Sequence, residues 1–174
     1  MRKLIASLAA AVLLAGAGSL AYAQKIGVIN SGEVLEKSIE GKRIISRLTE
    51  RDKQNQTAIT KLDDEIRALQ TKLNTQRLTL TEEAAMNYQS DLEKKNTDRK
   101  RMAEDAYTGI QELQSRLFKR LQDEIIPIVE ALGKERGLDI IFDLQKSGAV
   151  WWNPATDITS EIIKRYDASK ATQK

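Results

Sequence analysis

The stretch ITKLDDEIRALQTKL, residues 59–73, decides the fold of this chain. Its large aliphatic residues recur at alternating steps of three and four, at Ile59, Leu62, Ile66, Leu69 and Leu73. This is the heptad spacing that places one stripe of a helix against a second helix. The stretch therefore predicts one arm of a helical coiled coil.

The same spacing extends outward on both sides, from Ile45 to Leu80. Polar residues occupy three positions of this apolar seam, namely Asp52, Asn55 and Gln76. Polar seam residues set the register of two helices and also weaken their packing. Two interpretations stay open: a seam with its register fixed in the ordinary way, and a hairpin soft enough to open.

A turn is expected at residues 78–83, LTLTEE, because Thr79 or Thr81 can cap a helix that begins with Glu82 and Glu83. A second apolar period follows, at Met86, Leu92, Met102, Ala106, Ile110, Leu113, Leu117, Leu121 and Ile125. Two long helices joined by a short turn form an antiparallel hairpin. At about 1.5 Å per residue, an arm of about 35 residues projects about 50 Å.

Individual residues near the hairpin indicate where helices start, bend and end. Asn30 is expected to cap a short helix, and Gly41 to loosen its end. Pro127 is expected to kink the second arm near Glu124, and Gly137 to end it.

Short β-branched segments flank the hairpin on both sides. Strands are predicted at residues 25–29 (KIGVI), 138–143 (LDIIFD) and 149–152 (AVWW), and a last helix from Ser160 to about Tyr166. The predicted fold class is therefore mainly α with a small β body, into which a long antiparallel helical hairpin is inserted. Such a small sheet has exposed edges, and other copies of the chain are the simplest partners to cover them.

The first 23 residues have the features of an export signal. Arg2 and Lys3 precede an apolar run, and Ala21-Tyr22-Ala23 matches a cleavage site. Cleavage after Ala23 lowers the formal net charge from +3 to +1, so net charge gives no general attraction to polyanions. The predicted division of the chain is a signal peptide at 1–23, a body from 24–44 and 126–174, and a hairpin from 45–125.

Composition and spacing argue against an enzyme. The chain has no Cys and no His, which excludes a disulfide framework, the usual zinc sites and nucleophiles paired with His. The adjacent acids Asp63, Asp64 and Glu65 point about 100° apart on a helix, so they do not converge. We therefore predict no catalytic residue, no metal and no cofactor. The export signal argues against nucleic acid as a partner.

Five segments in a fixed order resemble the Skp/OmpH family of periplasmic chaperones. They are KIGVIN at residues 25–30, the charged hairpin, GLDIIFD at 137–143, AVWWNP at 149–154 and DITSEII at 157–163. The resemblance implies a homotrimer whose sheets form a β-barrel-like body and whose hairpins, or tentacles, enclose a cavity. It also implies an ATP-independent holdase in the periplasm of a Gram-negative bacterium, which keeps unfolded outer-membrane proteins soluble before membrane insertion.

Several residues are candidates for these roles. The expected client contacts in the hairpin are Met86, Tyr88, Leu92, Met102 and Tyr107. Methionine adapts its shape to varied partners, although Leu92 and Met102 also fit the seam of the hairpin. The expected buried set of the oligomeric body is Ile26, Val28, Ile140, Phe142, Val150 and Trp152.

The densest basic group of the hairpin is Lys94, Lys95, Arg99, Lys100 and Arg101. Neighbouring acids favour an ordinary solvated helix surface. The alternative is contact with anionic lipid headgroups or with lipopolysaccharide phosphates, the latter claimed for the family that the chain resembles. A rival class for the whole protein is a structural coiled-coil spacer or adaptor of the cell envelope, which should have a continuous apolar seam.

Overall fold

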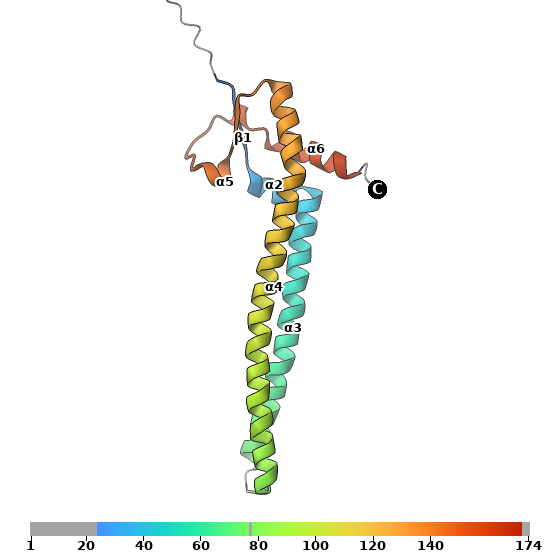
Figure 1. Cartoon of the computed structure of the whole chain (residues 1–174), viewed down its shortest axis with the longest axis vertical. Coiled ribbons are helices and arrows are strands. Elements are labelled where there is room, and N and C mark those ends of the chain that lie inside the picture. Colours follow the sequence, from blue (N-terminus) through green and yellow to red (C-terminus); the bar gives the residue numbers. More distant parts are fainter. Residues whose placement is uncertain (1–23, 77, 172–174) are drawn as a thin grey trace, which may run out of the picture.

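The computed structural model describes residues 24–76 and 78–171. Two long helices, α3 (Ile39–Thr75) and α4 (Glu82–Arg136), lie side by side in opposite directions and project from a small body (Figure 1). The other elements are β1 (Ile26–Ile29), α2 (Ser31–Lys37), β2 (Ile140–Asp143), α5 (Leu144–Ser147), the 3-10 helix η1 (Pro154–Thr156) and α6 (Thr159–Ala171). This architecture confirms the prediction of a mainly helical chain with a small sheet and a long hairpin.

The predicted export signal, residues 1–23, falls outside the described residues. Within the described ranges, no helix has an apolar run long enough to cross a membrane.

The first arm begins earlier than its heptad spacing predicted, at Ile39 instead of Ile45. The Ser38 side chain caps α3 by accepting a hydrogen bond from the Gly41 amide at 3.0 Å. The prediction that Gly41 loosens a helix end was wrong, because Gly41 lies in the first turn of α3. A Cβ there would overlap the carbonyl oxygen of Leu35, so glycine permits the close approach of α2 and α3.

The seam of α3 is buried where the spacing is regular. Ile66 is buried, and the aliphatic positions Ile59, Leu62, Leu69 and Leu73 are half-buried. At the root of the arm the prediction was wrong by one residue, since Ile44 is 4% exposed and Ile45 is 41% exposed. Ile44 packs in a core that also receives α4 and α6, so three elements and not one seam decide which face is buried.

The turn of the hairpin forms as predicted, with Thr81 as the cap. The amides of Thr79 and Leu80 donate to the Gln76 carbonyl at 2.9 and 3.0 Å. The Thr81 hydroxyl accepts from the Ala84 amide at 3.3 Å and starts α4, whose first turn carries Glu82 and Glu83.

The second arm, α4, continues through Pro127 as a single helix to Arg136. The sequence predicted a kink at Pro127, and α4 remains α-helical on both sides of this residue. Gly137 ends α4 in the left-handed conformation, with φ of 63°, as its position predicted.

The sheet consists of β1 and β2 in parallel, and Ile26 pairs with Ile140 while Val28 pairs with Phe142. The predicted third strand at residues 149–152 was wrong for the single chain: α5 and a left-handed Gly148 precede a segment that bends at Val150 and has no ladder partner. The other edge of β1 is taken by Asp157 in an isolated bridge with Val28. A strand needs a partner for its backbone groups, and the described part of the chain offers this segment none.

The core of the body lies where α6 crosses the roots of both arms. Its buried residues are Ile29, Val34, Ile44, Leu121, Ile125, Leu132, Ile158, Ile162 and Tyr166. The last helix extends from Thr159 to Ala171, which is longer than the predicted Ser160 to Tyr166. Its C-terminal half therefore reaches across to α4.

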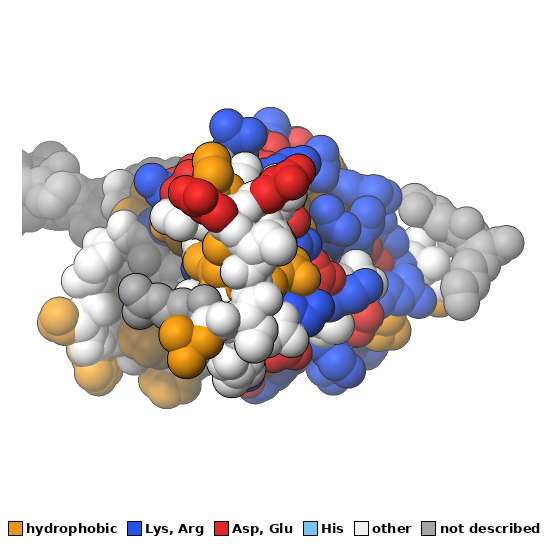
Figure 2. Space-filling view, turned by 90° about the horizontal axis from the view of Figure 1, so that it is seen from below, with side chains coloured by type: hydrophobic (Ala, Val, Ile, Leu, Met, Phe, Trp, Pro, Cys, Tyr) orange, Lys and Arg blue, Asp and Glu red, His pale blue; other side chains and the backbone are white. Residues whose placement is uncertain are grey.

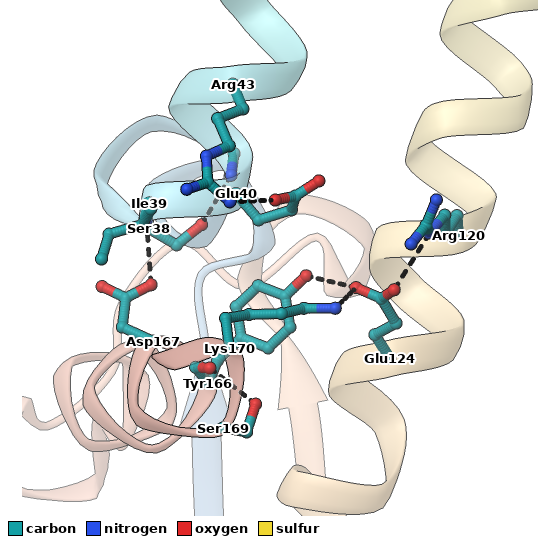
Figure 3. Close-up of polar contacts among 11 residues, drawn as sticks. Ser38, Ile39, Glu40, Arg43, Arg120, Glu124, Tyr166, Asp167, Ser169 and Lys170 are labelled. Carbon is teal, nitrogen blue, oxygen red and sulfur yellow. Dashed lines mark hydrogen bonds and ion pairs between the residues drawn. The ribbon is translucent and has the colours of Figure 1, made fainter. Parts of the chain in front are cut away.

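A polar cluster joins α6 to α4 beside this core (Figure 3). The Glu124 carboxylate accepts hydrogen bonds from the Tyr166 hydroxyl at 2.5 Å, Lys170 Nζ at 2.8 Å and Arg120 Nε at 3.0 Å. Burial alone would raise the pKa of Glu124, but the hydrogen bonds from Lys170, Tyr166 and Arg120 outweigh it and lower the pKa to about 2.

The Glu124 cluster predicts a specific acid sensitivity. Because the folded pKa lies below the ordinary 4.5, the stabilisation is complete above pH 4.5 and is lost as pH falls toward 2. The wild-type chain should lose about 2 kcal/mol more than Glu124→Gln between pH 6 and pH 3, as measured by urea unfolding. Glu104→Gln, on the exposed surface of the same helix, is the control, and an equal loss in Glu124→Gln would contradict the prediction.

Candidate functional site

The five residues expected to contact a client do not form one surface. Met86 and Tyr107 are each 67% exposed, whereas Tyr88 and Leu92 are half-buried beside the first arm. Met102 lies at the boundary, where it lines a hollow of about 360 Å³ with Arg51.

Heptad spacing explains this division. Met86 and Tyr107 are three heptads apart, so they lie on the same outward face of α4. Tyr88 and Met102 are two heptads apart and lie on the side of α3, where Lys72 Nζ is 6.0 Å from the Tyr88 ring centroid. Of the five candidates, Met86 and Tyr107 are therefore well exposed, Tyr88 and Leu92 lie at the seam, and Met102 lies beside the seam but is still 36% exposed. The expectation that Met86 belongs to the apolar period of the second arm was wrong.

Two of the five basic candidates tie the arms together. Arg99 donates to both carboxylate oxygens of Asp63, at 2.9 and 3.3 Å, and Lys95 Nζ lies 2.6 Å from a Glu65 oxygen. The hydrogen bond from Arg99 lowers the pKa of the Asp63 carboxyl. The hydrogen bond from Lys95 does the same for Glu65.

The other three basic candidates are exposed, and Arg101 also lines the hollow beside Met102. Lys100 lies 4.0 Å from Glu104, and Lys94 and Arg101 are exposed. Figure 2, a view from below, shows Lys and Arg side chains gathered along one side of the molecule, with acidic side chains among them. The basic candidates thus divide into an inter-arm pair and a solvated group.

The acids that were judged not to converge are held apart as expected. Asp63 and Glu65 face different partners on α4, and Asp64 lies 3.3 Å from Arg67 on its own helix. Among the described residues, no group of three or more acidic side chains is placed to hold a metal ion.

The body presents an apolar face that the single chain leaves open. Side chains alternate along a strand, so Ile26, Val28, Ile140 and Phe142 lie on the same face of the sheet. Within the chain only Val28 of the six predicted body residues is buried. The exposed ones are Ile26, Ile140, Phe142, Val150 and Trp152.

Two apolar features of the root were not found from the sequence. Trp151 is 77% exposed next to Val150, which is 99% exposed. An apolar hollow of about 490 Å³ lies between α2 and α4, with Val34, Phe118 and Ile126 in its lining. The signal for the hollow was an apolar stripe at residues 117–129 of α4 that is wider than one partner helix requires.

The comparisons with known proteins give a family model and a solved structure of similar fold. The family model described as outer membrane protein, OmpH-like, matches residues 25–166. The structure resembles the crystal structure of an OmpH-like protein from Caulobacter crescentus, assigned as an outer membrane chaperone, with a TM-score of 0.75 and 17% identity over 84% of this chain and 85% of that one. No match was found among curated proteins.

Exposure along α4 predicts how its apolar residues contribute to stability. Tyr107→Ala should change the free energy of unfolding by less than about 0.5 kcal/mol, because the side chain makes few contacts. Leu113→Ala should cost about 2 kcal/mol or more, because Leu113 is buried against α3. Urea unfolding followed by circular dichroism measures both, and a larger cost for Tyr107→Ala would place that side chain in a packed interface.

Proposed function

The chain belongs to the OmpH-like family, and from this premise we propose that it is an ATP-independent holdase chaperone and not an enzyme. Its clients are unfolded outer-membrane β-barrel proteins, which it keeps from aggregating before they insert into the membrane. The observation that carries the proposal is the projecting hairpin, whose outward face exposes Met86 and Tyr107. Single exposed apolar side chains are common on soluble proteins, so the support comes from their place on one face of a long projecting arm.

The proposed chemistry of binding is non-directional. A holdase binds many sequences, so apolar contact spread over a long surface suits it better than a deep pocket with fixed polar groups. The hollows along the hairpin are shallow and lined by mixed charges, as at Arg47, Glu50 and Arg116. Each contact is weak, so the client leaves when its own folding into the membrane is more favourable, and no nucleotide is required.

The proposed assembly is a homotrimer that places three hairpins around a cavity. Support comes from the uncovered sheet face, whose residues Ile140 and Phe142 are each 42% exposed in the single chain. A second copy would also supply ladder partners for residues 149–152, which form no strand alone. The proposed body comprises residues 24–44 and 126–174, and the proposed tentacle comprises residues 45–125.

The proposed location is the periplasm of a Gram-negative bacterium, after cleavage following Ala23. The sequence of residues 1–23 and the absence of Cys from the whole chain support export without a disulfide framework. Contact with anionic lipid or lipopolysaccharide phosphate is a subsidiary proposal. Lys94, Lys100 and Arg101 would carry it, since Lys95 and Arg99 already bind acids of α3.

A structural spacer remains the second candidate, because one part of the hairpin is well packed. The buried Ile66 and the inter-arm pairs of Asp63 and Glu65 favour a stiff rod over the middle of the arms. A spacer needs no affinity for unfolded chains, so one measurement separates the two functions.

A client assay tests the proposed holdase activity. A denatured outer-membrane β-barrel protein is diluted into buffer with the purified chain, and aggregation is followed by light scattering. The wild-type chain should suppress scattering, and Met86→Ser with Tyr107→Ser should raise the concentration needed by at least about threefold, because two exposed apolar contacts are lost.

The control for this assay is Gln89→Ser with Gln111→Ser, which changes two exposed polar residues of the same helix. It should retain wild-type suppression. Scattering unchanged by the wild-type chain would favour the spacer, and equal activity of the apolar and polar variants would remove the outward face of α4 from the binding surface.

Assembly is tested by the mass of the particle in solution. The wild-type chain should show three times its chain mass by multi-angle light scattering at micromolar concentration, and Phe142→Glu should be monomeric because it places a charge on the uncovered face. Ser160→Glu, at the exposed first turn of α6, should remain trimeric. A monomeric wild-type chain with intact helical circular dichroism would contradict the proposed assembly.

A further inference from the structure

Both arms of the hairpin leave the body at points that α6 contacts. Figure 1 shows α6 crossing beside the place where α3 starts and α4 passes. Figure 3 shows its side chains reaching toward both long helices. Three of the polar contacts drawn there join α6 to the arms: one reaches α3 and two reach Glu124 of α4.

The first arm is held at its N-terminus. The Asp167 carboxylate of α6 accepts a hydrogen bond from the Ile39 amide at 2.9 Å. The first amides of a helix lack partners within the helix and carry partial positive charge, so a carboxylate is favourable there. Ser38, which is fully buried, caps the same turn through Gly41.

The second arm is held at Glu124. Its carboxylate binds Tyr166 and Lys170 of α6 as well as Arg120 of its own helix. Tyr166 is fully buried, and Lys170 Nζ lies 5.5 Å from the centroid of the Tyr166 ring. Both groups that reach Glu124 from α6 are therefore fixed by packing.

The contact with Glu124 lies beside the weakest point of α4. Pro127 has no amide hydrogen, so the carbonyl of Asp123 receives no helical hydrogen bond from it, and the proline ring crowds that turn. Bending of a long helix concentrates at such a position. Glu124 is three residues before Pro127 and is the last tie to α6 on the arm side of it.

We propose that α6 sets the direction of the hairpin relative to the body. Asp167 fixes the start of α3, and Glu124, Tyr166 and Lys170 are positioning residues that restrain bending of α4 at Pro127. In an assembly of several hairpins, this restraint would set the width of the space between them. The role of that width in binding a client rests on the proposed function. The restraint of α4 by α6 does not, because all of its contacts lie within one chain.

The direct test is the distribution of distances between the body and the arm. The chain has no Cys, so spin labels can be placed at Ser90→Cys in α4 and Ser147→Cys in α5, both of which are exposed. Labelled chains are diluted with unlabelled chains so that one labelled copy is observed per particle. The helix that carries Ser147, α5, lies to the side of α4 in Figure 1, so a change in arm direction changes this distance.

Three variants make the test specific. Tyr166→Phe removes one hydroxyl and keeps the packing, and Glu124→Gln removes the charge that binds Lys170. Each should broaden the distance distribution at least about twofold relative to wild type. Adding Pro127→Ala to Glu124→Gln restores the backbone hydrogen bond to Asp123 and should return the width to the wild-type value.

The control is Glu104→Gln, which removes a charge from the exposed surface of α4 and should leave the distribution unchanged. A lower unfolding temperature with an unchanged width in Tyr166→Phe and Glu124→Gln would show that these residues only stabilise the body and would overturn the proposal. Failure of Pro127→Ala to narrow the distribution would also overturn it. The distances are measured without a client, so neither result depends on holdase activity.

Discussion

The parallel pairing of β1 with β2 is the constraint on which the rest of the structure depends. It joins residues 114 positions apart. Just before the strands, the Lys25 amide donates to the Asp139 carboxylate at 2.7 Å, and the Asp139 amide donates to the Lys25 carbonyl at 2.8 Å. Parallel strands require a long crossover connection, and here that connection is the hairpin itself. Both arms must therefore begin and end at the same small body, and their length is free to vary without disturbing it.

Local signals made most of the architecture predictable. The aliphatic period of residues 59–73, the cap at Thr81 and the left-handed Gly137 depend on neighbours within a turn or two, so the sequence carries them directly. Ile44 and Ile45 show where prediction from local signals fails. At the root, α2, α4 and α6 meet α3 together, and the buried face is chosen by packing between elements that are distant in sequence.

For the candidate site, the segment 149–152 and the hairpin surface show how far prediction from the sequence reached. The β-branched and aromatic character of AVWW indicated a strand, but strand formation depends on a partner edge, which the sequence of one chain does not specify. The division of the hairpin candidates was available from spacing alone. Met86 and Tyr107 share one heptad position, and Tyr88 and Met102 share another, so the outward pair could have been separated from the seam before the structure.

The root of the hairpin and its turn differ in apolar burial. Leu121 and Ile125 lie in the main core, whereas Leu78 at the turn is 99% exposed. The free energy of local opening follows apolar burial, so the tip opens more easily than the root. Under the proposed function, such an arm would adapt at its far end to clients of different size while its near end keeps a fixed direction. Pro127 removes a helical hydrogen bond near that end, so packing of the apolar seam alone would leave α4 weakest there. The polar contacts of Glu124 with α6 support the helix at this position.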